Sequence, residues 1–161
     1  MNFKSHFSLK EVIQKLEYYC SYQERCHTEV YEKLYTFDTS HDEKEEVIVH
    51  LIQNNFLNEE RFALLFTISK LHQKKWGKIR ITQELKVRKI STYLINKAIN
   101  SLSIEEYNVT FHLLSEHYWE FISEKNKLKK RKKFCDYLLR KGWESDLVYS
   151  KAKEMEIGFE E

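Results

Sequence analysis

Residues 81–99 read ITQELKVRKISTYLINKAI, and this stretch indicates how the whole chain is built. Ile81 and Leu85 stand four residues apart, as they would on one face of a helix. Ser91 then supplies a side-chain oxygen that can cap a new helix. The apolar positions after it recur at three and four residues, as Leu94, Ile95, Ala98 and Ile99. The stretch therefore predicts two amphipathic helices joined by a short polar link.

The same start signals recur along the chain. In a capping box, a serine and a glutamate three residues later satisfy each other's backbone amides. Such pairs stand at Ser8–Glu11, Ser40–Glu43 and Ser103–Glu106, and Asn58 is a further candidate cap. Proline is absent and glycine occurs three times, so the tight turns that a β fold needs are scarce. We expect an all-α fold of about nine helices.

A repeat of about 50 residues groups these helices in threes. Equivalent leucines recur at intervals of 51 and 53 residues, as Leu34, Leu85 and Leu138. Five residues after the last two stand Ile90 and Trp143, whereas Thr39 holds that place in the first copy. Self-similarity at this period is typical of tandem helical arrays. We predict three tandem three-helix modules at residues 8–56, 57–103 and 104–157, forming an elongated, curved array, with Tyr18, Tyr19 and Tyr22 packed inside the first.

The sequence offers no convincing catalytic or metal site. It has no phosphate-binding loop, dinucleotide fingerprint or nucleophile elbow, and its seven histidines are scattered. The three cysteines, Cys20, Cys26 and Cys135, lack zinc-finger spacing. An odd number of cysteines without a secretory signal also argues against a disulfide framework. We expect a protein that is not an enzyme and that binds no metal and no cofactor.

No membrane segment is expected either. No apolar run approaches the roughly 20 residues that span a bilayer, and the first residues lack the apolar core of a signal peptide. We therefore expect a cytoplasmic monomer.

The charges are clustered although the net charge is only +2. Residues 70–89 carry eight bases and one acid, and residues 124–141 carry nine bases and two acids, which gives each block a net charge of +7. Such clustering indicates a polyanionic partner. The candidate binding residues are Lys74, Lys75, Lys78, Arg80, Lys86, Arg88, Lys89, Lys125, Lys129, Lys130, Lys132, Lys133 and Arg140.

Helical geometry gives the second block an outward face. At 100° per residue, one side of the helix is predicted to be apolar, with Leu128, Cys135, Leu138 and Leu139. The opposite side then presents Lys129, Lys132, Lys133 and Arg140. Lys127 and Arg131 fall near the apolar side, so they must extend their charges to solvent, or the helix begins later.

Two interpretations stay open for the first block, which surrounds Gly77. Trp76 stands among its bases and could stack on a nucleobase. Alternatively, Trp76 fills the joint between modules and the lysines only solvate their helices.

Three segments resemble the RecX family of recombinase regulators. Residues 57–63, LNEERFA, are similar to its pattern Leu-Asp-Asp-x-Arg-Phe-Ala. Residues 77–85, GKIRITQEL, resemble its Gly-x-x-x-Ile-x-x-Glu-Leu segment, and residues 134–143, FCDYLLRKGW, its Phe-Leu-x-Arg-Arg-Gly-Phe ending. Asn58, Lys141 and Trp143 stand where aspartate, arginine and phenylalanine are usual, and the first module lacks the common glycine turn.

The resemblance implies a fold of three tandem three-helix modules and no active site. It also implies a regulator that binds the RecA recombinase filament on single-stranded DNA and inhibits or modulates its activity in recombination and DNA repair. The partner would be the filament, with single-stranded DNA reached through it, and the basic residues above would face both.

Two other functions remain open on the residues alone. In the first, the basic helix at 125–140 enters a DNA major groove directly, as in helix-turn-helix proteins. In the second, the chain is a helical scaffold without a nucleic-acid partner, whose binding would be insensitive to salt.

Overall fold

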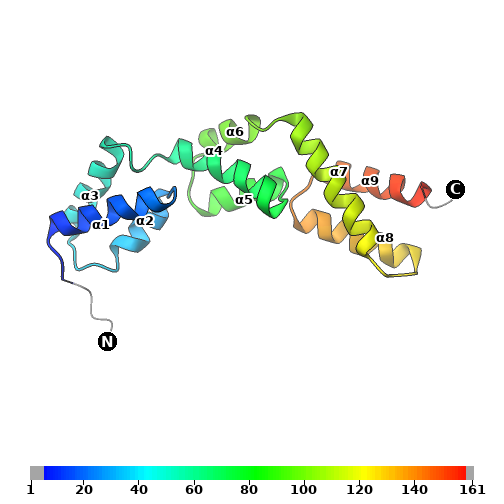
Figure 1. Ribbon diagram of the computed structural model, residues 1–161, viewed down its shortest axis with the longest axis horizontal. Coiled ribbons are helices and arrows are strands. Elements are labelled where there is room, and N and C mark those ends of the chain that lie inside the picture. The colour runs from blue at the N-terminus through cyan, green and yellow to red at the C-terminus, as the bar shows by residue number, and fades with distance from the viewer. Residues whose placement is uncertain (1–5, 159–161) are drawn as a thin grey trace.

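The protein is described by a computed structural model that places residues 6–158. These residues form nine α-helices and one π-helical turn and no β-strand, so the predicted all-α class is confirmed. The elements are α1 (Leu9–Tyr22), α2 (His27–Leu34), α3 (His41–Gln53), α4 (Glu59–Ser69), η1 (Lys70–Lys74), α5 (Lys78–Val87), α6 (Thr92–Asn100), α7 (Ile104–Phe121), α8 (Lys127–Arg140) and α9 (Ser145–Ile157). Figure 1 shows an elongated molecule, with α1–α3 at one end, α4–α6 in the middle and α7–α9 at the other end.

The helices begin where the caps predict. The Ser8 amide donates to Glu11 Oε2 at 2.8 Å, and the Glu11 amide donates to Ser8 Oγ at 3.2 Å. Ser40 and Glu43 form the same box. Asn58 and Ser91 each accept one amide hydrogen from the third residue of α4 and α6. Side-chain caps such as these typically stabilise a helix by about 1 kcal/mol.

The third predicted box is only half formed. Ser103 Oγ accepts from the Glu106 amide at 3.3 Å, but the Glu106 carboxylate does not return to the cap. It lies 3.7 Å from His72 Nε2 on η1 instead. The carboxylate therefore connects the third triplet to the second instead of capping its own helix.

The repeated leucines are the centres of the packing. Leu34, Leu85 and Leu138 are fully buried. In the second and third copies, the same backbone hydrogen bond closes the turn after the leucine. The Ile90 amide donates to Leu85 O at 3.1 Å, and the Trp143 amide donates to Leu138 O at 3.2 Å. In the first copy Phe37, not Thr39, is the buried residue after the helix.

The apolar core has two parts. One lies among α1, α2 and α3 and includes Val12, Leu16, Val30, Val47 and Leu51. The other is continuous from α4 to α9, and it also takes in Cys26 from the start of α2. The second and third triplets therefore share one core, whereas the first has its own. The module boundaries at 56/57 and 103/104 stay a prediction.

The tyrosines expected inside the first triplet are divided between core and surface. Tyr19 is half-buried and packs on this core. The side chains of Tyr18 and Tyr22 are instead 72% and 73% exposed. Their helix buries Val12, Leu16 and Cys20, and Tyr18 and Tyr22 lie off that stripe, so packing inside the triplet is wrong for both.

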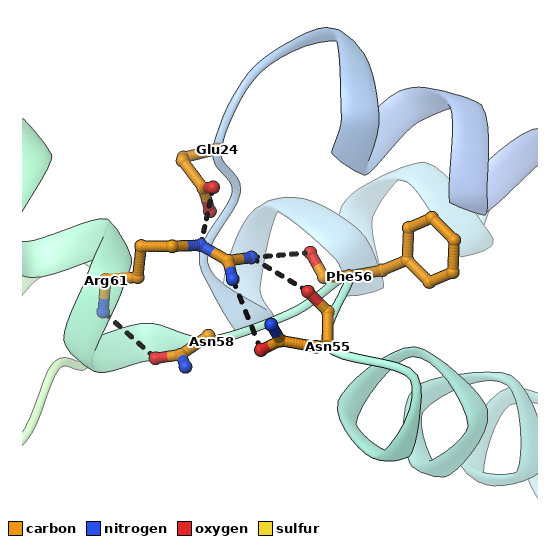
Figure 2. Close-up of polar contacts among 5 residues, drawn as sticks. All are labelled: Glu24, Asn55, Phe56, Asn58 and Arg61. Atoms are coloured by element: carbon orange, nitrogen blue, oxygen red, sulfur yellow. Dashed lines mark hydrogen bonds and ion pairs between the residues drawn. The ribbon is translucent and has the colours of Figure 1, made fainter.

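Arg61 ties the first triplet to the rest of the chain. Its Nε donates to Glu24 Oε1 at 2.6 Å, and its other nitrogens donate to the side chain and carbonyl of Asn55 at 3.2 and 3.0 Å (Figure 2). A longer bond of 3.5 Å reaches the carbonyl of Phe56. One guanidinium thus connects α4 to the α1–α2 link and to the end of α3.

Candidate polyanion-binding interface

The backbones of two glycines meet where the second and third triplets join. The Gly77 amide donates to Lys141 O at 2.9 Å, and the Ile79 amide donates to Gly142 O at 3.0 Å. A Cβ on Gly77 would stand 2.4 Å from Gly142 O. Gly142 has a φ of 92°, and a Cβ there would stand 2.3 Å from Arg80 Cβ. Only glycine fits at either position, which explains the glycines of both RecX-like segments.

The first turn of α5 is closed to outside anions. Between the two amides already bonded across the joint, the Lys78 amide donates to Tyr107 Oη at 3.0 Å. Tyr107 Oη in turn donates to Glu144 at 2.7 Å. Burial raises the pKa of Tyr107 well above its ordinary value, and the Glu144 bond adds to this. The hydroxyl therefore stays protonated and holds α5 on α7 and α9.

Cations from both basic blocks gather around this joint. Lys141 Nζ donates to Lys74 O at 2.9 Å, and Arg80 Nη1 donates to Arg140 O at 3.3 Å. Trp143 Nε1 donates to Lys75 O at 3.1 Å. Burial lowers the pKa of Lys141, and the neighbouring Arg80 and Lys74 charges lower it further. We call the basic residues that contribute a side chain or a backbone group to this joint the joint cluster; its members are Lys74, Lys75, Lys78, Arg80, Arg140 and Lys141.

The joint cluster lacks acidic partners among the residues that the structure describes. The ion pairs of these residues lie elsewhere in the chain, and none of their carboxylates comes within 4.0 Å of a cluster cation. Like charges held together in this way repel one another unless an anion is bound. The cluster is therefore a candidate surface for a polyanion.

Trp76 lies inside the joint. It is half-buried, with its ring centroid 6.4 Å from that of Phe66. The Arg80 guanidinium lies 4.3 Å and Lys70 Nζ 5.3 Å from its centroid. Of the two alternatives for Trp76, the structure favours packing in the joint over stacking on a nucleobase.

Part of the basic run that begins α8 is matched by acids. Lys132 Nζ lies 2.7 Å from Asp136, and Lys133 Nζ lies 3.4 Å from Glu124. The Asp136 bond raises the pKa of Lys132. Lys130 Nζ lies 4.3 Å from the centroid of Trp119. The densest run in the sequence is thus less available to a partner than the joint cluster, although Lys125 and Lys129 are exposed.

Most α8 side chains have the exposure that helical periodicity predicts. Its outward residues Lys129, Lys132, Lys133 and Arg140 are all exposed, and Cys135 and Leu138 are buried. Arg131 is half-buried and bonds Glu156 of α9 at 2.9 Å, so it does extend its charge from the apolar side. Leu128 was expected on that side but is 79% exposed. It lies in the first turn of α8, before the buried stripe that begins at Phe134.

The remaining candidates lie at the far end of α5. Arg88 pairs with Glu84 at 3.0 Å and lies 4.8 Å from the centroid of Phe66. Its carbonyl accepts from Thr28 Oγ1 at 3.2 Å, which links α5 to α2. Lys86 and Lys89 are exposed beside it. The predicted residues therefore form three groups and not one continuous face.

Sequence comparison finds similarity to one family. Residues 58–99 match the family described as RecX, second three-helix domain. The regulatory protein RecX of Lactobacillus gasseri is 33% identical over 95 residues, which cover 59% of this chain and 35% of that relative. The comparisons support a RecX-family protein.

Solved RecX structures share the fold. The crystal structure of RecX from Lactobacillus salivarius superposes with a TM-score of 0.78 at 22% identity, covering 92% of this chain and 97% of that one. A second crystal structure, of a regulatory protein RecX, gives a TM-score of 0.80 at 20% identity, covering 91% and 73% of the two chains. At this identity the likeness establishes the fold alone.

The joint cluster extends beyond the matched RecX domain. Lys74, Lys75, Lys78 and Arg80 lie within residues 58–99, whereas Arg140 and Lys141 come from the third triplet. Lys141 was not among the residues predicted to bind. The signal for it was present, since it precedes the glycine of the RecX-like segment 134–143, where arginine is usual.

The described residues hold no group of three or more His, Cys, Asp or Glu side chains arranged for a metal ion. None of the described helices combines the length and the apolar character needed to cross a bilayer.

Proposed function

We propose that this RecX-family protein binds the RecA recombinase filament on single-stranded DNA and inhibits it, with no catalytic activity of its own. The family supports a regulatory role, and the chain carries a cationic surface suited to a partner rich in phosphate. The match covers only 35% of the curated relative's length, so activity and partners are part of the proposal.

The observation that carries the proposal is the joint cluster. Its six cations come from two triplets that share one core, so they are held together by the fold rather than by a flexible tail. Such a surface recognises a regularly spaced polyanion, which a DNA-bound filament supplies. Each phosphate contact should add about 0.7 to the steepness of log K against log salt for a single strand.

The direct test is the ATPase rate of recombinase on single-stranded DNA with increasing amounts of the protein. We expect inhibition that weakens as salt rises. Lys74→Gln/Lys75→Gln/Arg140→Gln removes three exposed cluster charges without removing a side-chain contact that the structure shows, and should inhibit less. Unchanged inhibition by this variant at every salt concentration would remove the joint cluster from the interface.

A matched variant controls for net charge. Lys10, Lys97 and Lys153 are exposed and lie outside all three groups of candidates; Lys97 forms an exposed ion pair with Glu60, which should contribute little to stability. Their replacement by glutamine lowers the net charge by the same three units. This control should inhibit as well as the parent, because the proposal assigns the effect to the place of the charges and not to their sum.

A second candidate function is direct binding of duplex DNA, with α8 in the major groove. The exposed Lys125 and Lys129 favour it, whereas the pairing of Lys132 and Lys133 with acids opposes it. A major-groove reader binds duplex DNA with sequence preference and without recombinase. Preference of this kind in a binding assay would replace the proposal above.

A further inference from the structure

A groove of about 880 Å³ lies on the first triplet, away from the joint cluster. One wall belongs to α1, and the other is formed by Lys33 at the end of α2 and the residues after it. On the α1 side Tyr18 and Tyr22 stand one helical turn apart, with ring centroids 6.4 Å apart. Both are largely exposed, so packing among the described residues does not account for them.

The apolar residues that line the groove within the described part of the chain are all aromatic. Among these described residues the lining includes no leucine, isoleucine, valine or methionine. At one end Phe7 meets Phe37 edge-on, with centroids 5.8 Å apart. Tyr19 lies along the floor, half-buried against the core. A groove that takes an apolar helix is usually lined by flexible aliphatic or methionine side chains, which this one lacks.

Cations border these rings. Lys15 Nζ lies 4.5 Å from the centroid of Phe7, and Lys33 Nζ lies 5.6 Å from that of Tyr19. The Arg25 guanidinium lies 3.8 Å from the Tyr19 centroid. Among the described residues, the one acid in the lining is Glu11, and its carboxylate accepts from the amide of Ser8 in the cap of α1. Exposed rings bordered by cations form a surface for nucleobases and the phosphates that join them.

We infer that this groove binds single-stranded nucleic acid through its bases. Tyr18 and Tyr22 stack on successive bases, and Lys15 and Lys33 lie near the backbone. The inference goes beyond the proposed function, because it assigns a base-contacting site to the first triplet and requires no recombinase. Stacking of this kind is largely indifferent to sequence, since every base has a π-face.

The test is fluorescence anisotropy of a short labelled oligothymidylate with the full chain and no recombinase. Tyr18→Ala/Tyr22→Ala should weaken binding by about ten-fold or more. Tyr18→Phe/Tyr22→Phe keeps both rings and should bind as the parent does. Tyr93 on α6 is 71% exposed and lies outside the groove, so Tyr93→Ala is the matched control and should change nothing.

An abasic oligonucleotide of the same length separates base contacts from phosphate contacts. The parent should bind it more weakly than oligothymidylate, and the double alanine variant should bind both alike. Parental affinity of the alanine variant for oligothymidylate overturns the inference, as does a parent that binds both oligonucleotides equally or neither.

The proposed function is tested separately, with recombinase present. An alanine variant that keeps its oligonucleotide affinity but no longer inhibits the filament would show that the groove takes a protein segment. That outcome overturns this inference and leaves the proposed function standing. The exposed positions of both tyrosines predict unchanged thermal unfolding of every variant.

Discussion

At the scale of single residues, Leu85 is a sharp test of the core. It is fully buried at the centre of the repeat, so Leu85→Ala leaves a cavity that the neighbours fill only in part. We expect the free energy of unfolding to fall by about 2–5 kcal/mol, measured by urea denaturation. Val87 on the same helix is 74% exposed, and Val87→Ala should change the value by less than about 0.5 kcal/mol.

Gly142 tests the close approach at the joint. An alanine there would meet Arg80 and hold a positive φ. Gly142→Ala should therefore lower the free energy of unfolding by more than about 1 kcal/mol. Gly158 ends α9 with a φ of −64° and meets nothing closer than 3.7 Å. Gly158→Ala should leave stability unchanged or slightly higher, and equal losses from the two variants would contradict the role given to the joint.

Single residues also show why a sequence predicts some features and not others. Leu85 and Leu138 could be identified because helical periodicity marks buried positions. Lys141 was missed because its role depends on Lys74, 67 positions away in the chain, whose carbonyl accepts a hydrogen bond from Lys141 Nζ. Leu128 was placed wrongly because periodicity says which side of a helix a residue is on, but not whether another helix packs there.

At the scale of elements, α8 and the joint cluster carry comparable positive charge, but acids pair with two lysines of α8 and with none of the cluster residues among the described residues. Lys129→Gln/Lys132→Gln/Lys133→Gln should weaken filament inhibition and flatten its salt dependence, by about 0.7 in slope for each phosphate that is no longer bound. The effect should be smaller than for Lys74→Gln/Lys75→Gln/Arg140→Gln, because acids already neutralise two of the α8 lysines. The measurement is the same ATPase titration over a series of salt concentrations.

The thermal unfolding of the α8 variant should stay close to that of the parent, because exposed ion pairs contribute little to stability. A larger effect from α8 than from the joint cluster would make α8 the main binding surface and favour the major-groove alternative.

Elements were predicted better than the contacts between them. Caps and apolar stripes are local signals, so the starts of α1, α3, α4 and α6 follow from Ser8, Ser40, Asn58 and Ser91. The half-formed box at Ser103 was not predictable, because Glu106 turns toward His72 from a distant segment. The same limit applies to the site: the sequence shows the charge of each block, but its neutralisation on α8 and its concentration at the joint depend on folding.

At the scale of the whole molecule, the first triplet has its own core and meets the rest of the chain across a boundary with little apolar contact. Its core meets the other mainly through Cys26, and polar contacts hold the rest of the boundary. Arg61 is the centre of these contacts, with bonds to Glu24, Asn55 and Phe56. The groove that we infer to bind nucleobases lies on the first triplet, and the joint cluster lies on the other two triplets. The boundary between them therefore sets the spacing between the two surfaces.

Arg61→Ala should therefore loosen the boundary without unfolding either core. The second oxygen of Glu24 is buried and has no hydrogen-bond partner among the described residues, so loss of Arg61 leaves that carboxylate poorly compensated, at a cost of about 1–3 kcal/mol. We expect chymotrypsin to cut faster at Phe56 and Leu57, releasing a fragment whose helices α4–α9 keep their amide protection in hydrogen exchange. Arg25→Ala is the matched control, because the hydrogen bond and ring contact of the Arg25 side chain among the described residues are made to Tyr19, inside the first triplet. It should leave the cutting rate unchanged. If Arg61→Ala instead exposes amides throughout the chain, the two cores unfold as one unit and the predicted module boundary at 56/57 is wrong.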